Sequence, residues 1–235
     1  MGDAARMNIE DESAGKKIVP DAQQEHWQAT FSQKPDMFGL DRSEPAVKAA
    51  GQFEREGKRK LLELGCGQGR DTLFFASRGF QVTAADYSQA AVETVLSKAR
   101  SAGLDGLIAG VRQDVREPLI GFPDEYFDAC YSHMLFCMAL TTTELERLAQ
   151  EVWRVLRPGG LNVYTVRHTA DAHCGAGVHR GEDMWEVGGF IVHFFNREKV
   201  VHLARGFEIV SIDEFEEGGL PRKLFRVTLR KETQP

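Results

Sequence analysis

The stretch LLELGCGQGRD, residues 61–71, decides the fold that we predict for this chain. It joins a short apolar run to a helix-like segment and places glycine at Gly65, Gly67 and Gly69. Gly65 permits a tight turn after a strand, and Gly67 allows a ligand to approach the backbone. Gly69 permits unusual dihedral angles or close packing where the helix begins. The stretch therefore predicts a strand, a ligand-binding turn and a helix in succession.

The segments that follow alternate between strands and helices. We expect strands in KLLEL (60–64), FQVTAAD (80–86), GLIAGVRQDV (106–115), YFDACYSHM (126–134) and LNVYTV (161–166). Helical patterns lie between them at residues 71–79, 88–103 and 141–160. Short apolar strands that alternate with helices need crossover connections, which predicts a mostly parallel sheet with helices on both faces.

Two of these helices carry recognisable ends. Ser88 is the expected N-cap and Gly103 the expected terminator of the helix at residues 88–103. In the helix at residues 141–160, Thr143 and Glu146 fit a capping box, and the Pro-Gly-Gly at 158–160 is expected to end the helix.

The end of the chain has a different pattern. After an expected helix near residues 196–205, GFEIVSI (206–212) and KLFRVTLR (223–230) read as strands joined by a short segment with no helical period. Such a link suits an antiparallel pair. The predicted fold is therefore α/β, a Rossmann-like, doubly wound, mostly parallel seven-stranded sheet with an antiparallel last strand.

The composition limits the possible classes of function. The chain has 235 residues, of which 42% are hydrophobic, enough for a full core. Its net charge of −6 argues against a broad nucleic-acid surface, which needs a basic face, and against a polybasic membrane anchor. No signal peptide is evident, and no stretch approaches the roughly 18 apolar residues of a membrane span. We expect a cytoplasmic protein that binds neither nucleic acid nor membranes.

The cysteines also favour a cytoplasmic location. Cys66, Cys130, Cys137 and Cys174 form no CxxC pair. The first two fall in runs that predict burial, where reduced thiols behave as small hydrophobic side chains.

An acidic residue indicates what the glycine turn binds. Asp86 ends the second expected strand, about 20 positions after Gly65, where a carboxylate can accept two hydrogen bonds from a ribose. Asp86 could instead serve as a helix N-cap, but Ser88 fits that role better. The glycine turn and Asp86 together indicate a cofactor that contains adenosine.

The spacing of the glycines narrows the choice of cofactor. Dinucleotide sites usually read GxGxxG, whereas here the third glycine comes one position early and Asp71 stands at the helix start. An acid there would repel a pyrophosphate and suits a positively charged ligand. No GK[ST] sequence follows, which excludes a Walker-type phosphate loop. The cofactor that combines adenosine, an ammonium and a sulfonium is S-adenosylmethionine.

The motifs LLELGCGQGRD, AADYS, RQDV, FDACYSHM and EVWRVLRPGGLNVYTV together resemble those of class I S-adenosylmethionine-dependent methyltransferases over about residues 55–170. Residues 1–20 are polar and aperiodic, and we expect them to be disordered. The resemblance implies one methyltransferase domain over residues 21–235, with a helical cap at residues 21–55. It also implies S-adenosylhomocysteine as the product.

The resemblance implies roles for particular positions. The methionine portion of the cofactor would lie against Glu63, Gly65, Cys66, Gly67, Gly69 and Asp71. Asp86 would hold the ribose, Tyr87 and Ser88 would lie near the adenine, Asp114 would accept its amino group, and Val115 would donate a backbone amide. Ser132 and His133 would face the sulfonium. Trp27 and Phe31 would close over the cofactor, although simple packing explains these aromatics equally well.

Residues 167–195 form a long insertion after the fifth strand, which we interpret as the substrate-binding cover. It contains four histidines, His168, His173, His179 and His193, together with Arg167 and Cys174. These side chains could form a partly cationic pocket that supplies a base, bind a metal or metalloid, or play no chemical role. Their spacing matches no familiar zinc pattern, and we predict no metal. The catalytic candidates are His133, His168, His173, His179 and Arg167.

The acceptor is expected to be a small molecule. The C-terminal region is similar to that of tellurite-resistance-type and thiol methyltransferases, which implies a soft sulfur, selenium or tellurium nucleophile. The alternatives are an oxygen or nitrogen acceptor of a natural-product or quinone-like compound, and a protein that binds the cofactor without transferring its methyl group. No apolar heptad or exposed stripe indicates an oligomeric state.

Overall fold

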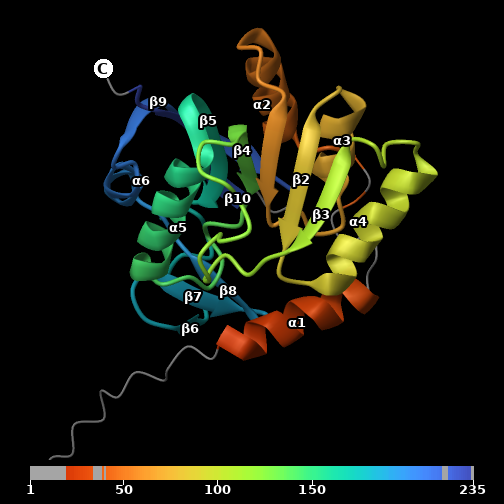
Figure 1. The fold of residues 1–235 in the computed structure, drawn as a ribbon. Coiled ribbons are helices and arrows are strands. Elements are labelled where there is room, and N and C mark those ends of the chain that lie inside the picture. Colours follow the sequence, from red (N-terminus) through yellow and green to blue (C-terminus); the bar gives the residue numbers. More distant parts are fainter. Residues whose placement is uncertain (1–19, 34–38, 40, 219–221, 234–235) are drawn as a thin grey trace, which may run out of the picture.

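The computed structural model of the chain describes residues 20–33, 39, 41–218 and 222–233. A central seven-stranded sheet lies between two layers of helices (Figure 1). The strands are β1 (Lys60–Leu64), β2 (Gln81–Asp86), β3 (Ile108–Arg112), β4 (Phe127–His133), β5 (Leu156–Arg167), β9 (Phe207–Glu217) and β10 (Arg222–Lys231). The predicted disorder of residues 1–20 concerns a segment that, apart from residue 20, lies outside the described residues.

The order of the strands is β3-β2-β1-β4-β5-β10-β9. The pairs from β3 to β5 are parallel, and β10 is antiparallel to both of its neighbours. The predicted α/β sheet with an antiparallel last strand is confirmed. Because the chain order reverses between β1 and β4, a crevice opens at their carboxyl ends, where ligands bind in open α/β sheets.

Each face of the sheet is covered by helices with apolar inner sides. On one face lie α2 (Glu44–Arg55), α3 (Arg70–Ser77) and α4 (Gln89–Ser101), and on the other lie α5 (Thr142–Val155) and α6 (Arg197–Leu203). Helix α1 (Pro20–Gln33) runs across the end of the molecule where the parallel strands finish (Figure 1). It therefore lies over the crevice rather than on the sheet.

The glycine turn has the conformation that its sequence predicts. Gly65, Gly67 and Gly69 all have positive φ angles, of 71°, 51° and 84°. A Cβ atom on Gly69 would lie only 2.8 Å from Cγ2 of Val95 on α4. Gly69 is thus required both by its left-handed conformation and by the packing of α4 against the start of α3.

The ends of α5 differ from the prediction. The capping box is formed by Thr141 and Glu144, not by Thr143 and Glu146, since the Glu144 carboxylate accepts a hydrogen bond from the Thr141 backbone N–H at 2.7 Å. Three consecutive threonines leave the position of the cap ambiguous in the sequence. The helix ends at Val155, and residues 156–160 belong to β5. A proline restricts the residue before it to extended conformations, so Pro158 causes the helix to end before residue 158 and not at it.

The insertion is folded rather than an open loop. It contains a small antiparallel sheet of β6 (Val178–His179), β7 (Met184–Val187) and β8 (Phe190–His193). Gln23 of α1 donates a hydrogen bond to the carbonyl of Gly189 at 2.9 Å, and the Trp27 ring lies 4.8 Å from that of Phe190. Helix α1 and the insertion therefore form one continuous wall over the crevice, whereas α2, which belongs to the same predicted cap at residues 21–55, packs on the sheet.

Candidate functional site

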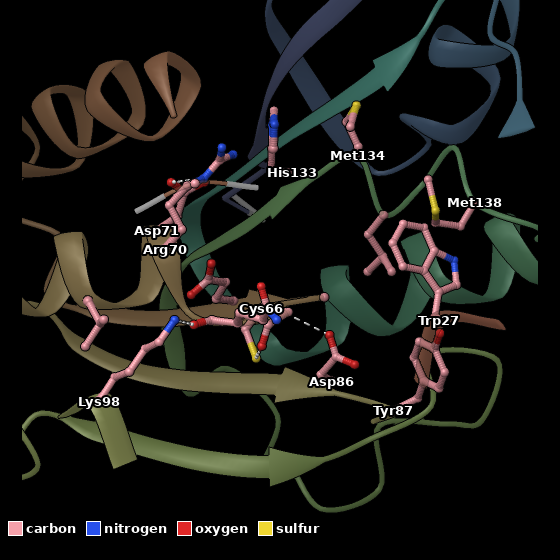
Figure 2. A pocket seen from close by; sticks show the side chains of 17 residues that line it. Trp27, Cys66, Arg70, Asp71, Asp86, Tyr87, Lys98, His133, Met134 and Met138 are labelled. Carbon is pink, nitrogen blue, oxygen red and sulfur yellow. Dashed lines mark hydrogen bonds and ion pairs between the residues drawn. The ribbon is translucent and has the colours of Figure 1, made fainter. Parts of the chain in front are cut away.

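The first hollow lies between the glycine turn and α1 and has a cavity of about 160 Å³ (Figure 2). Its walls come from the carboxyl ends of β1, β2 and β4, from the start of α3 and from α1. The residues that line it are Trp27, Gly39, Glu63, Gly65, Cys66, Gly67, Gln68, Arg70, Asp71, Leu73, Asp86, Tyr87, Lys98, His133, Met134, Leu135 and Met138. Most of the predicted cofactor-binding positions thus meet in one place.

Asp86 is held in place at the centre of this hollow. Its Oδ2 accepts a hydrogen bond from the backbone N–H of Gly67 at 2.9 Å (Figure 2). Its Oδ1 accepts one from the backbone N–H of Ser88 at 2.9 Å. Burial raises the pKa of Asp86, and the backbone N–H groups offset part of this rise. Each oxygen keeps a further lone pair, so the fixed carboxylate can accept hydrogen bonds from a pair of hydroxyl groups.

The floor of the hollow is rich in carboxyl groups. Glu63, Asp71 and Asp86 are all at least nine-tenths buried. Burial raises the pKa of Glu63 to about 8, and the negative charges of Asp71 and Asp86 add to this rise. A hydrogen bond from the Thr72 hydroxyl to the Glu63 carboxylate acts in the opposite direction and lowers the pKa. Such a site favours a cationic ligand, because a positive charge relieves the repulsion among these groups.

Asp71 also has a structural role that the sequence did not indicate. Its carboxylate accepts hydrogen bonds from the backbone N–H of Ser43 at 2.8 Å, from the Ser43 hydroxyl at 2.7 Å and from the Tyr131 hydroxyl at 3.2 Å. These bonds join α3 to the start of α2 and to β4. Asp71 therefore lines the hollow while its oxygens point largely into the protein.

A second, smaller hollow continues from the first beside Tyr87, and Asp114 and Val115 lie in its wall. Trp27 lines both hollows and lies next to Tyr87 and Met138 (Figure 2). The Tyr87 hydroxyl is buried and has no hydrogen-bond partner among the described residues. An unpartnered buried hydroxyl in a cavity wall is typical of a site that a ligand completes.

Ser132 and His133 lie on opposite faces of β4, because successive side chains of a strand alternate. His133 lines the first hollow, whereas Ser132 is fully buried and does not. Nδ1 of His133 lies 2.9 Å from the Thr165 hydroxyl, and Nε2 lies 3.2 Å from the Glu217 carboxylate. Both ring nitrogens are thus engaged by partners within the chain.

A third hollow adjoins the first beneath the insertion. Its lining residues are Trp27, Met134, Met138, Arg167, His173, Trp185, Val187, Phe190, Val192, Phe194 and Arg222. Two candidates from the insertion, Arg167 and His173, are therefore placed at the site. The predicted cover is formed largely by β7, β8 and the residues that follow them.

Several predicted residues lie away from the three hollows. His168 is buried against the ring of Phe225, and His179 is exposed with Nε2 2.8 Å from the carbonyl of Glu182. Ser88 is fully buried, and its hydroxyl caps α4 by accepting from the Ala91 N–H. Phe31 lies in α1, but its side chain is outside the described part of the structure.

No sequence pattern singles out Met134, Leu135 and Met138, which follow β4 and line the first hollow. Apolar side chains in such a segment are predicted as core. What distinguishes this segment is visible only in the structure: Met134 has a positive φ of 58°, and the chain turns there next to the crevice.

The described residues lack both a metal-ligand cluster and a membrane-spanning helix. They contain no cluster of three or more histidine, cysteine, aspartate or glutamate side chains arranged to hold a metal ion. Nor do they include a helix with the length and apolarity needed to cross a membrane.

Residues 62–164 match a family model described as a methyltransferase domain. Among curated proteins, the chain is 30% identical over 147 residues to hemagglutinin 1 of Eikenella corrodens, a match that covers 60% of this chain and 46% of that protein. The chain spans less than half of the length of the first curated relatives that it matches.

Solved structures share the whole fold at low identity. The 1,6-didemethyltoxoflavin-N1-methyltransferase of Burkholderia thailandensis, which holds S-adenosylhomocysteine, has a TM-score of 0.72 at 17% identity and covers 98% of this chain and 100% of its own. TehB from Haemophilus influenzae has a TM-score of 0.63 at 18% identity, with 88% of this chain and 67% of its own covered.

Proposed function

We propose that this chain, whose residues 62–164 match a methyltransferase domain, transfers the methyl group of S-adenosylmethionine to a small-molecule acceptor. The observation that carries this proposal is the fixed Asp86 carboxylate beside the Gly67 backbone, in a carboxylate-lined hollow. An adenosine with a sulfonium and an ammonium satisfies each of these features.

The three hollows suggest how the ligands are arranged. The ribose hydroxyls would bind Asp86, and the adenine would lie in the second hollow near Tyr87, Asp114 and Val115. The ammonium would lie toward Glu63. The sulfonium would then face Met134 and Met138, which line both the first and the third hollow. This arrangement leaves the third hollow for the acceptor.

The methyl transfer requires few chemical groups from the protein. The lone pair of the acceptor forms the new bond to the methyl carbon while the sulfur–carbon bond breaks and its electron pair returns to sulfur, giving S-adenosylhomocysteine. The protein aligns the two groups and excludes water. Because both ring nitrogens of His133 are engaged, this arrangement favours an acceptor that attacks as an anion, such as a thiolate or a related selenium or tellurium species.

A screen of acceptors tests this proposal. Thiols, chalcogen oxyanions, phenols and amines are each incubated with the protein and S-adenosylmethionine, and S-adenosylhomocysteine is measured. We expect product from at least one class of acceptor that is anionic at the assay pH. Tight cofactor binding without product from any class would instead favour a protein that binds the cofactor without transferring its methyl group.

We also expect cofactor binding to release a proton from Glu63. The raised pKa of about 8 keeps this carboxyl protonated at pH 6.5 in the empty site, and an adjacent cation favours its ionised form. Affinity for S-adenosylmethionine should therefore rise with pH between about 6 and 7.5. Calorimetry at pH 6.5 in buffers of different ionisation enthalpy should show the release of about one proton.

The matched control for this measurement is Glu63→Gln, which keeps the shape of the side chain and removes the titrating group. The variant should release no proton at pH 6.5. Identical binding enthalpies in all buffers for the wild-type protein would contradict the predicted ionisation of Glu63.

A further inference from the structure

The third hollow is placed to receive the methyl acceptor. It shares Trp27, Met134 and Met138 with the first hollow, and its cavity of about 170 Å³ is similar to the first one of about 160 Å³. In-line attack requires an acceptor that lies in contact with the methyl group. The residues that line the third hollow should therefore indicate which class of acceptor binds there.

Aromatic rings make up much of the wall of this hollow. Trp27, Trp185, Phe190 and Phe194 come from α1, β7, β8 and the residue directly after β8. Phe190 is fixed by contact with the rings of both His26 and Trp27, with centroids 4.5 and 4.8 Å away. Such walls favour a flat, apolar body that can stack on them.

The charged groups that line the hollow are both positive. They are Arg167 and Arg222, and no carboxylate from the described residues is among the lining side chains. Arg222 begins β10 and is exposed. Within the described part of the chain it has no ion-pair partner, so its guanidinium can bind an anion that enters the hollow.

Arg167 supplies a second, rigid donor. It is buried, and its Nε donates to Oδ2 of Asp171 at 3.0 Å while Nη2 also contacts that carboxylate. Asp171 is itself held by the backbone N–H groups of Lys223 at 2.8 Å and His173 at 2.9 Å. The charge of Arg167 is thus balanced and its position fixed. No hydrogen bond from its Nη1 to a described residue is present, which leaves this group for a ligand.

We propose that the third hollow binds the acceptor as a small, ring-bearing apolar compound with a carboxylate, the ring against Trp27, Trp185 and Phe190 and the carboxylate at Arg222 with support from Arg167. The role of this ligand as the acceptor rests on the proposed function, whereas the preference of the hollow for an apolar acid does not. A planar guanidinium matches the two oxygens of a carboxylate better than a neutral group.

Calorimetry with a matched pair of probes tests this inference. 2-Naphthoate and 2-naphthamide have the same ring and differ in charge, and each is titrated into the protein saturated with S-adenosylhomocysteine. We expect the wild-type protein to bind naphthoate at least about ten-fold more tightly than naphthamide. In Arg222→Gln the two affinities should agree within about two-fold, because the preference comes from the guanidinium.

Arg147→Gln is the matched control. Arg147 is exposed on α5, away from the three hollows, and its loss changes the net charge by the same amount. This variant should keep the full preference for naphthoate. Equal affinity of the wild-type protein for the two probes, or an unchanged preference in Arg222→Gln, would overturn the inference.

The titration of S-adenosylhomocysteine alone separates this inference from the proposed function. If that compound fails to bind, the proposed function is wrong, and naphthoate titrated into the free protein still tests the hollow. If it binds and naphthoate is not preferred, only the ligand class assigned to the third hollow is wrong.

Discussion

Replacing Asp86 with alanine is expected to weaken the binding of S-adenosylmethionine by about 2–3 kcal/mol, or roughly 30- to 150-fold. The Asp86 carboxylate is held by the backbone N–H groups of Gly67 and Ser88, so it is oriented before the ligand arrives. Its removal costs two charge-assisted hydrogen bonds to the ribose and leaves two backbone donors without their partner. Calorimetry on both proteins measures the difference.

Two further variants make this test specific. Asp105→Ala removes the same charge from an exposed position between α4 and β3 and should leave the affinity unchanged. Asp86→Asn keeps the size of the side chain, loses its charge and should fall between wild type and alanine. If Asp86→Ala binds the cofactor as tightly as wild type while remaining folded by circular dichroism, the carboxylate does not hold the ribose.

The second large effect concerns stability. Asp71→Ala should lower the free energy of unfolding by about 3 kcal/mol. The buried carboxylate accepts three hydrogen bonds from Ser43 and Tyr131, and its removal leaves buried donors unsatisfied. The start of α2 also loses its connection to α3. Urea denaturation followed by circular dichroism measures the change.

Asparagine at position 71 provides the comparison for this variant. Asp71→Asn keeps one acceptor oxygen and should recover part of the lost stability. A loss below about 1 kcal/mol in Asp71→Ala would mean that these hydrogen bonds contribute little beyond those made with water in the unfolded chain. The presence of a carboxylate at position 71 would then be explained by ligand binding alone.

The main features of the fold could be predicted because they depend on local patterns. The glycine turn, the N-cap at Ser88 and the antiparallel β10 each follow from a few neighbouring residues. The capping box could not be placed, because three threonines offered equivalent positions and the choice depends on how α5 packs.

The candidate site was predicted less completely than the fold. Asp86 ends β2 and Tyr87 follows it, and the carboxyl end of this strand must face the crevice, so the position of both residues is determined by topology. The histidines of the insertion are placed by β6, β7 and β8, whose pairing the sequence did not indicate. His173 consequently reaches the third hollow, while His168 and His179 do not.

Trp27 of α1 belongs to the wall of all three hollows. If the cofactor and the acceptor bind in these hollows as proposed, a movement of this one indole would alter the surroundings of both ligands at once, and their binding equilibria would be linked. Thermodynamic linkage is reciprocal, which means that any factor by which the cofactor raises the affinity for the acceptor must also apply in the other direction. The N-terminal helix is thereby the element through which heterotropic cooperativity would arise in a single chain.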